Sequence, residues 1–269
     1  MRFDAYVSEK GLCPSRTKAA EAISRGEILL NGKIVTKPSY KVDGTETLGK
    51  TAFSFVSLGG YKLEKAFLDF PSFRAEGKTF ADVGASTGGF TECLLRHGAK
   101  KVYAIDVGES LLSEDLRNDP KVIPIERCNA RNMTEETIGE KAEGAVCDVS
   151  FISLKLILPA LKACLKEGGQ VAALIKPQFE AGKGEVGKNG VVREAALHTQ
   201  ICAMIMQFAQ DIGFWVRDLS FSPITGPKGN IEFLLYLENS GNESPATLES
   251  FSLLAAQIVA QAHESCIKS

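Results

Sequence analysis

Residues 79–90 read TFADVGASTGGF, and this stretch decides the fold. The apolar run over 80–83 predicts a strand, residues 84–89 form a glycine-rich turn, and residues 90–97 predict a helix. Such a turn between a strand and a helix lets the backbone approach a ligand closely and directs helix N–H groups toward it. The turn matches neither the G-x-G-x-x-G pattern nor a phosphate-binding loop, since no Lys-Ser/Thr pair follows it.

A second strand, over 102–106, ends in Asp106, 24 residues after Asp82. A carboxylate at this place can accept hydrogen bonds from both hydroxyls of a ribose. The turn and the acid together fit either a dinucleotide or S-adenosylmethionine. Asp82 favours S-adenosylmethionine, because a carboxylate directly before the turn suits a cationic amino-acid end and opposes a pyrophosphate.

Strands and helices continue to alternate after this point. Further strands are predicted over 122–125, 144–148, 171–176, 214–221 and 231–237, and helices over 109–117, 152–166 and 194–212. The alternation predicts an α/β fold with a mostly parallel, doubly wound, Rossmann-like sheet. Ligands bind such sheets at the carboxyl ends of the strands.

Three charged residues stand where apolar strands end or begin. Asp148 and Lys176 each follow a buried strand, and Glu232 interrupts the apolar stretch that starts at Ile231. An acid in such surroundings is costly to bury without a partner. One lysine and two carboxylates that converge would satisfy one another, either as a buried salt-bridge cluster or as a catalytic site.

The first 50 residues form a different, α+β pattern. Helices are predicted over 2–10 and 16–25, the second with Ser15 as its N-cap. Two short apolar runs flank Asn31-Gly32, which is the strongest local signal for a two-residue hairpin. Residues 43–60 are rich in Gly, Thr and Ser and read as a junction, so we divide the chain into domains 1–56 and 57–269.

Charge differs between these two parts of the chain. Residues 1–50 hold nine Lys/Arg and six Asp/Glu, a net charge of +3, whereas the remainder holds 22 and 27, a net charge of −5. A basic module on an acidic body is compatible with phosphate contact through one end, although an excess of three charges is a weak signal.

Bulk properties indicate a globular, intracellular protein. The chain has 269 residues, of which 44% are hydrophobic and 24% charged, and its seven dispersed cysteines include no C-x-x-C pair. An odd, scattered set of cysteines is typical of free thiols in a reducing compartment. Neither a signal peptide nor a membrane span is predicted, so we expect a cytoplasmic protein. His97, His198 and His263 are too separated in the sequence to predict a metal site.

The position of Lys62 in the sequence does not indicate a functional role. Leu63, Ala66, Phe67 and Phe70 fall on one face of a predicted helix, and Lys62 precedes it and lies off that face. Position alone predicts an exposed lysine.

Residues 1–48 resemble the S4 RNA-binding domain. The matching residues are Arg2 and Asp4, the run Ser15–Ala19, Ile23, Gly26, the run Leu30–Lys33, and Lys37-Pro38. In that family the second helix and the hairpin form a basic surface for structured RNA. The resemblance implies RNA-binding roles for Arg2, Arg16, Lys18, Arg25, Lys33 and Lys37.

Residues 57–237 resemble the FtsJ-type 2′-O-ribose methyltransferases, and the whole chain resembles the TlyA family, often labelled hemolysin A, which joins an S4 domain to an FtsJ-like domain. The motifs that carry this resemblance are Asp82–Thr91, Cys147–Ser153, Lys176–Glu180 and Ser222–Pro227 followed by Asn230–Phe233. The FtsJ Lys-Asp-Lys-Glu tetrad falls on Lys62, Asp148, Lys176 and Glu232.

The resemblance implies S-adenosylmethionine-dependent methylation of a ribose 2′-hydroxyl in ribosomal RNA or a ribosomal subunit, at cytidine. Lys176 is then the base or oxyanion stabiliser, oriented by the two carboxylates. Burial and a second ammonium favour a neutral amine there, whereas the carboxylates favour the charged form, and the sequence leaves the outcome open. The predicted cofactor-binding residues are Asp82, Gly84, Ser86, Gly88, Gly89, Phe90, Asp106, Asn129 and Asp148.

Three details carry alternatives. Similar family members have an arginine at position 58, where this chain has leucine, which puts that arginine's contact in doubt. Asn129 lies near the expected adenine edge but reads equally well as a turn residue. Residues 181–190, with four glycines and two lysines, predict either a lid that orders on RNA or a plain flexible loop.

Three other functions fit the sequence less well. An NAD-dependent oxidoreductase fits Asp82 and the tetrad poorly. A membrane-active hemolysin would require a long amphipathic or apolar segment, which the sequence lacks. A non-catalytic RNA-binding protein would not require a complete tetrad. The oligomeric state is predicted as a monomer or a weak dimer.

Overall fold

The computed structural model describes residues 1–51, 54–182, 184–187, 189–226, 228–240 and 245–266. Contacts divide the chain into two compact units, Met1–Leu58 and the chain from Gly59 onward. The division that we place after residue 56 lies two residues before this boundary. Each unit is described by itself.

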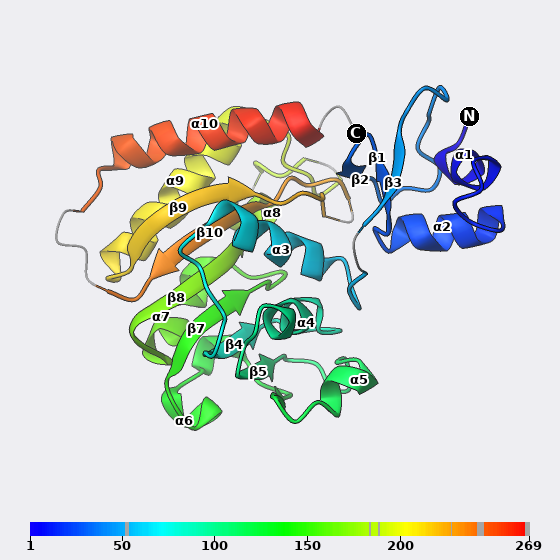
Figure 1. Ribbon diagram of the computed structural model, residues 1–269. Helices are drawn as coiled ribbons and strands as arrows, with labels where there is room; N and C mark the ends of the chain where they lie inside the picture. The colour runs from blue at the N-terminus through cyan, green and yellow to red at the C-terminus, as the bar shows by residue number, and fades with distance from the viewer. Residues whose placement is uncertain (52–53, 183, 188, 227, 241–244, 267–269) are drawn as a thin grey trace. The chain divides into compact units, whose positions relative to one another are not determined.

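The first unit is a small α+β domain (Figure 1). Its elements are α1 (Phe3–Glu9), α2 (Arg16–Ser24), β1 (Ile28–Leu30), β2 (Lys33–Ile34) and β3 (Leu48–Lys50). The hairpin forms at the predicted place: Leu30 pairs with Lys33, and Asn31 and Gly32 both have positive φ, 50° and 75°, as a type I′ turn requires.

The core of this unit lies between the two helices and the sheet. Phe3, Val7, Ala19 and Ile23 are fully buried there. The predicted junction 43–60 contains the boundary between the two units and also a strand that was not predicted: β3 pairs antiparallel with the free edge of β1, with Leu48 opposite Leu30. A three-residue strand with two intermediate residues and one exposed residue gives no periodic signal in the sequence.

The second unit has a seven-stranded sheet. Its strands are β4 (Thr79–Val83), β5 (Lys101–Ile105), β6 (Val122–Ile125), β7 (Ala142–Cys147), β8 (Leu165–Ile175), β9 (Trp215–Phe221) and β10 (Phe233–Glu238). The order is β6-β5-β4-β7-β8-β10-β9. Strands β4 to β8 are parallel, and β10 runs antiparallel to both of its neighbours. The expected mostly parallel, doubly wound sheet is confirmed.

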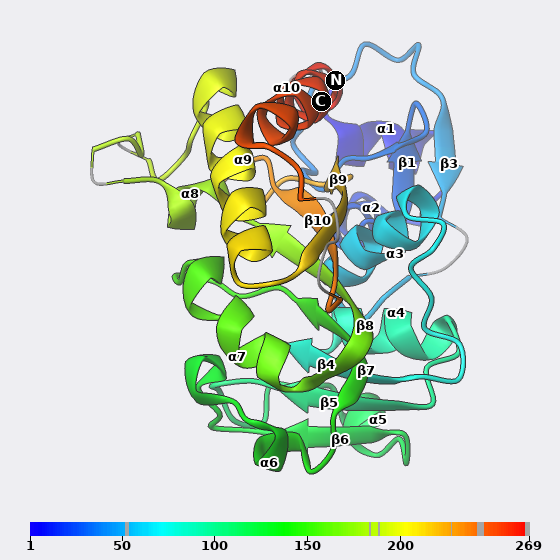
Figure 2. The ribbon, with the colours of Figure 1, turned by 90° about the vertical axis from the view of Figure 1, so that its left-hand side faces the viewer.

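Helices cover both faces of this sheet. They are α3 (Gly59–Asp69), α4 (Gly89–Arg96), α5 (Glu114–Arg117), α6 (Glu135–Ile138), α7 (Leu158–Ala163), α8 (Pro177–Glu180), α9 (Ala195–Asp211) and α10 (Leu248–Cys266), with 3₁₀ turns η1 (Ala130–Asn132) and η2 (Leu154–Leu156). Figure 2 shows α3 and α4 on one face and α7, α9 and α10 on the other. Within the described part of the chain, none of the helices has the length and apolar character required to cross a bilayer.

Several of these elements differ from those predicted from the sequence. The helix predicted over 152–166 is divided into η2 and α7, because Pro159 starts a new helix at its first turn. Strand β8 begins at Leu165, where the helix was still expected. The helix predicted over 109–117 shrinks to α5, and α10 was not predicted at all.

Candidate active site

The site forms where the chain changes direction in the sheet. Strands β4 and β7 are neighbours, with Val83 opposite Cys147, while the chain leaves β4 toward β5 on the other side. Such a switch point opens a crevice at the carboxyl ends of the strands. Gly84 follows β4 with φ of 85°, and a Cβ there would lie 2.6 Å from the carbonyl oxygen of Asp148. Only glycine allows the two strand ends to approach so closely.

The tetrad predicted from the resemblance comes together at this place. Lys62 Nζ lies 2.6 Å from Glu232 Oε2 and 3.4 Å from Asp148 Oδ2. Lys176 Nζ lies 2.5 Å from Asp148 Oδ1. Asp148 thus stands between the two lysines. Antiparallel pairing explains the position of Glu232: Phe233 lies opposite Ile175, so the residue before β10 meets the residue after β8.

Burial and charge oppose each other in this cluster. The four side chains are between 2% and 18% exposed, so each charge loses most of its hydration. Burial lowers the pKa of Lys62, but the carboxylates of Asp148 and Glu232 outweigh it and the pKa is raised. Burial raises the pKa of Asp148, but the two ammonium groups outweigh it and the pKa is lowered. Lys62 is therefore a fixed cation and Asp148 a fixed anion at neutral pH.

The prediction from position that Lys62 is exposed and precedes the helix is wrong. Lys62 does not precede the helix but lies within its first turns, and it is buried. The periodicity of Leu63, Ala66 and Phe67 identifies the face that packs on the sheet, and all three are buried as expected. Lys62 is buried beside that face because its charged partners, Asp148 directly after β7 and Glu232 directly before β10, meet it there. The local pattern cannot indicate this.

A cavity of about 470 Å³ adjoins the tetrad at the ends of β4, β5 and β7. It is lined by five of the nine predicted cofactor residues: Gly84, Ser86, Asp106, Asn129 and Asp148. The volume lies in the range of sites for cofactor-sized ligands. Asp106 accepts hydrogen bonds from the backbone N–H groups of Ser86, at 2.9 Å, and Gly108, at 2.8 Å. Each of its oxygens has a further lone pair for a ligand hydroxyl.

The structure is compatible with both interpretations of Asn129, as a contact for adenine and as a turn residue. Asn129 lines the cavity, and its Oδ1 also accepts a hydrogen bond from the backbone N–H of Arg131 at 3.2 Å, which caps η1. The turn role is thus present in the structure, and a contact with adenine remains a prediction.

Four predicted cofactor residues do not line this cavity. Gly88, Gly89 and Phe90 shape the start of α4 instead; Gly88 has φ of 100°, and a Cβ there would lie 2.2 Å from Leu116. Asp82 lies beneath them, fully buried. Thr91 donates a hydrogen bond to its Oδ2 at 2.6 Å, while its Oδ1 has no partner among the described residues. Burial raises the pKa of Asp82 to about 7, against the effect of Thr91.

Two residues beside the tetrad, Ser150 and Phe151, are not predicted from the sequence. Lys176 Nζ donates a hydrogen bond to Ser150 Oγ at 3.0 Å. Phe151 lines the cavity, is 90% exposed and has a positive φ of 63°, and its ring lies 5.0 Å from that of Phe179. The motif Cys147–Ser153 contains both missed residues, but nothing in a single sequence separates a loop residue that faces the site from one that faces solvent.

The basic residues of the first unit are at or near its surface, and several are paired. Arg2 and Arg16 both bind Asp4, at 2.7 and 3.2 Å. The hydrogen bond from Arg2 lowers the pKa of Asp4 to about 2, so this buried carboxylate ties α1 to α2. Lys18 pairs with Glu21 and Arg25 with Glu27. The side chains of Lys33 and Lys37 are exposed.

Two groups of potential metal-ligating side chains are closer than the sequence suggests. His198 Nδ1 and His263 Nε2 are 2.9 Å apart, because α9 and α10 pack side by side. The view that the histidines are all well separated is therefore wrong for this pair. Glu64, Cys93 and His97 bring ligand atoms within 4.8 Å of one another, with His97 Nε2 at 2.8 Å from Glu64.

Parts of two predicted motifs lie outside the described residues. The two lysines of the possible lid 181–190 are Lys183 and Lys188, and neither is described; nor is Pro227, in the motif after β9. In the described part of the lid, Gly182 N donates a hydrogen bond to Glu185 at 2.6 Å. Leu58, which replaces the usual arginine, is half-buried.

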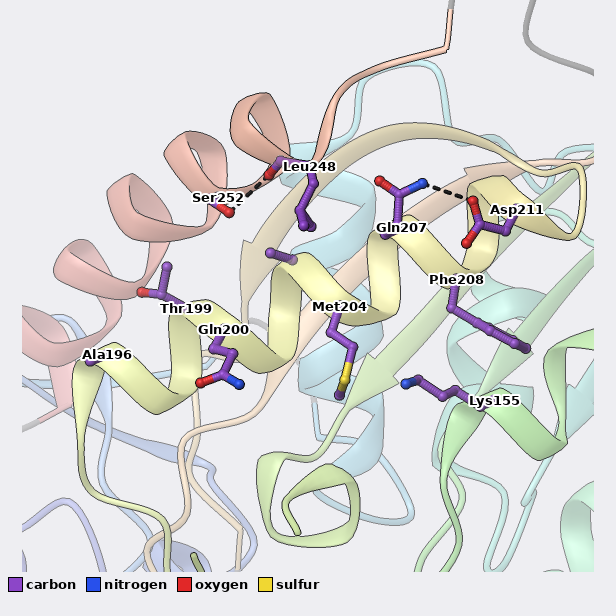
Figure 3. Close-up of a pocket in the computed structure, with 11 residues that line it drawn as sticks. Lys155, Ala196, Thr199, Gln200, Met204, Gln207, Phe208, Asp211, Leu248 and Ser252 are labelled. Atoms are coloured by element: carbon purple, nitrogen blue, oxygen red, sulfur yellow. Dashed lines mark hydrogen bonds between the residues drawn. The ribbon is translucent and has the colours of Figure 1, made fainter.

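A second cavity, of about 590 Å³, lies along α9 (Figure 3). Apolar side chains such as Met204, Phe208 and Leu248 line it together with Lys155 and Gln207. Gln207 donates a hydrogen bond to Asp211 at 2.8 Å, within the helix. No member of the tetrad lines this cavity, so the cavity at the strand ends is the candidate site.

Comparison with known proteins agrees with the two-unit organisation. Residues 55–239 match the FtsJ-like methyltransferases, and residues 1–48 match the S4 domain. The 16S/23S rRNA (cytidine-2′-O)-methyltransferase TlyA of Mycobacterium tuberculosis is 42% identical over 239 residues, 88% of this chain and 89% of the relative. Hemolysin A of Brachyspira hyodysenteriae is 43% identical over 238 residues, 88% of this chain and 99% of the relative.

A solved structure from Streptococcus thermophilus, described as a candidate hemolysin, has a TM-score of 0.75 and 42% identity and covers 100% of this chain and 97% of that one. Sequence, fold and the strand-end tetrad therefore agree: the chain belongs to the TlyA family of FtsJ-like methyltransferases that carry an S4 domain.

Proposed function

We propose that this protein transfers a methyl group from S-adenosylmethionine to the ribose 2′-hydroxyl of a cytidine in ribosomal RNA. The observation that carries the proposal is the buried cluster of Lys62, Asp148, Lys176 and Glu232 beside the cavity at the strand ends. The TlyA relative from Mycobacterium tuberculosis is named for this reaction and this nucleotide. A ribosomal substrate also favours the cytoplasm as the place of action.

The cavity residues suit S-adenosylmethionine. Asp106 would bind the ribose hydroxyls, and Gly84 and Ser86 would lie against the ligand. Asp82 does not line the cavity, but its Oδ1 has no partner among the described residues, and we assign it to the cationic amino-acid end. When bound, the cofactor supplies an electrophilic methyl group. The protein has to align the attacking oxygen with it and deal with the hydroxyl proton.

We assign the removal of the 2′-hydroxyl proton to Lys176. Among the described residues, Asp148 and Ser150 are the partners of its Nζ, so one of its three hydrogen-bonding directions is left for the substrate oxygen. Lys62 is held as a cation between two carboxylates and serves to fix Asp148, which in turn orients Lys176. Two lysines in one cluster thus have different tasks, set by their partners.

The test is methyl transfer to ribosomal RNA. Lys176→Ala should abolish transfer of tritiated methyl groups while the variant still binds S-adenosylmethionine, because Lys176 does not line the cavity. Calorimetry measures the binding, and mapping of 2′-O-methyl sites identifies the nucleotide. Full transfer by this variant would overturn the assignment of Lys176.

The name of the Brachyspira relative requires a parallel assay for membrane activity. Leakage from liposomes is measured with the same preparation that is used for methyl transfer. We expect methyl transfer without leakage; leakage without transfer would reverse the proposal.

A further inference from the structure

Glu180, the last residue of α8, binds a neighbouring loop with both of its carboxylate oxygens. Oε2 accepts a hydrogen bond from Ser153 Oγ at 2.5 Å, and Oε1 accepts one from the backbone N–H of Leu154 at 2.8 Å. The hydroxyl of Ser153 also accepts a hydrogen bond from the backbone N–H of Lys155 at 3.1 Å, so it caps η2 at the same time. Charge-assisted hydrogen bonds of this kind fix the geometry of both partners.

The two segments that Glu180 joins are those that carry the centre of the tetrad. Asp148 begins the loop that contains Ser153, and Lys176 directly precedes α8. Where the two segments leave β7 and β8, Lys176 Nζ lies 2.5 Å from Asp148 Oδ1. The segments are thus joined at both ends, once through the reacting groups and once through Glu180.

The loop between these contacts is held in an unfavourable backbone conformation. Phe151 has a φ of 63°, which costs free energy in a residue other than glycine and persists only where the surroundings enforce it. Its side chain is 90% exposed and contacts only the ring of Phe179 among the aromatic residues that the structure describes, at 5.0 Å, so this contact with α8 supports the loop together with its two flanking attachments. Strand β7 fixes the loop on one side, and the bonds from Ser153 and Leu154 to Glu180 fix it on the other.

Retaining a charge at this position has a cost. Burial raises the pKa of Glu180, although the hydrogen bonds from Ser153 and Leu154 act against this. An apolar side chain of similar size would fill this space without the desolvation cost of a carboxylate. The hydrogen bonds to Ser153 and Leu154 therefore account for a carboxylate at this position.

We propose that Glu180 is a positioning residue: together with Ser153 it clamps the loop after β7 to α8 and so holds Asp148 and Lys176 in their working geometry. The role rests on the proposed 2′-O-methyl transfer. It needs no contact between Glu180 and either substrate. Its effect belongs to the alignment of the reacting groups, where displacements of about 1 Å cost on the order of a hundredfold in rate.

The experiment compares Glu180→Ala, Glu180→Gln and Ser153→Ala in steady-state methylation of ribosomal RNA. Glu180→Ala should lower kcat by roughly 10- to 100-fold, with the KM for RNA unchanged. The loss of cofactor affinity should be smaller than the loss of kcat, although residues 148–152 of the clamped loop line the cavity. Glu180→Gln keeps an acceptor and the side-chain shape, so it should recover part of the loss. The double variant Glu180→Ala/Ser153→Ala should be no slower than Glu180→Ala alone, because both changes break one clamp.

The matched control is Glu167→Ala, which removes an exposed glutamate near the other end of β8 and should keep the wild-type kcat. Thermal unfolding and cofactor binding of each variant separate misalignment from loss of folded protein. A wild-type kcat in Glu180→Ala overturns the clamp, as does a loss that follows the folded fraction in both Glu180 variants. Absence of methyl transfer by the wild-type protein would instead remove the proposed function itself.

Discussion

At the scale of one residue, the proposed role of Asp82 in the site costs folding free energy. This residue is fully buried, one of its oxygens has no partner among the described residues, and its pKa is raised to about 7, chiefly by burial. Because this folded-state pKa exceeds the ordinary value of 3.8, folding favours the protonated acid. The associated stability is complete below about pH 4 and is lost as the pH rises through 7.

Asp82→Asn should therefore stabilise the ligand-free protein at pH 8 by roughly 1–3 kcal/mol, because it removes the cost of a buried negative charge. The gain should shrink at pH 6, where Asp82 is largely protonated. The same change should weaken binding of S-adenosylmethionine, since the carboxylate is proposed to face its cationic end. Urea unfolding at both pH values and calorimetric binding check the two effects.

Thr91→Val is the companion variant, because it removes the hydroxyl that donates to Asp82 and leaves the carboxylate in place. It should lower stability at pH 8. A less stable Asp82→Asn protein at pH 8, or one with unchanged cofactor affinity, would contradict this account.

At the scale of elements, the contact between α9 and α10 includes a histidine pair. His198, on α9, is fully buried, stacks edge-on against Phe233 with ring centroids 5.4 Å apart, and lies 2.9 Å from His263 on α10. Burial, together with a smaller effect of His263, lowers the pKa of His198 to about 4. Folding therefore favours the neutral imidazole, and protonation opposes the packing of the two helices.

The free energy of unfolding should fall as the pH drops from 7 to 5, because the unfolded chain binds the proton of His198 more tightly. This single group accounts for roughly 2 kcal/mol over that interval. His198→Gln keeps a hydrogen-bonding group for His263 but cannot titrate, so it should remove most of this contribution. Urea unfolding at several pH values measures the difference in slope between the two proteins, and equal slopes would reject the assignment.

At the scale of the whole molecule, chemistry and RNA contact are assigned to different units. The tetrad and the cavity belong entirely to the chain from Gly59 onward, which is acidic, whereas the first unit is basic. Lys18 and Arg25 of the first unit pair with glutamates at exposed positions, where such pairs contribute little and can be exchanged for phosphate contacts. Affinity for RNA and the rate of methyl transfer should therefore be separable.

Lys18→Ala/Arg25→Ala should weaken binding of ribosomal RNA and lower the slope of log affinity against log salt by about two, roughly one for each lost phosphate contact. The cofactor affinity should not change, and kcat at saturating RNA should stay close to wild type. Filter binding over a range of salt concentrations measures the slope. Lys121→Ala, a change of an exposed lysine in the second unit, is the control; an unchanged slope in the double variant would place the RNA contact elsewhere.

Much of the fold could be predicted because its signals are local. The apolar runs of β4 and β5, the glycine turn before α4, and the Asn31-Gly32 hairpin each follow from a few consecutive residues. Of the elements that the sequence analysis does not predict, β3 is three residues long and has no periodic pattern. In contrast, α10 has a regular one, with Phe251, Ala255, Val259 and Ala262 buried at helical spacing. Periodicity identifies the face of an element that is buried but does not name its partner.

The same distinction applies to the site. The sequence by itself determined the glycine turn, Asp106, and the placing of Asp148 and Lys176 at strand ends, because strand order and strand direction follow from the alternation of elements. Only the tertiary structure decided that Lys62 is buried between Asp148 and Glu232, that His198 meets His263, and that Glu180 holds the loop after β7. Those contacts join residues far apart in the chain, and their geometry is set by the packing of helices on the sheet and by the antiparallel register of β10, which no local pattern encodes.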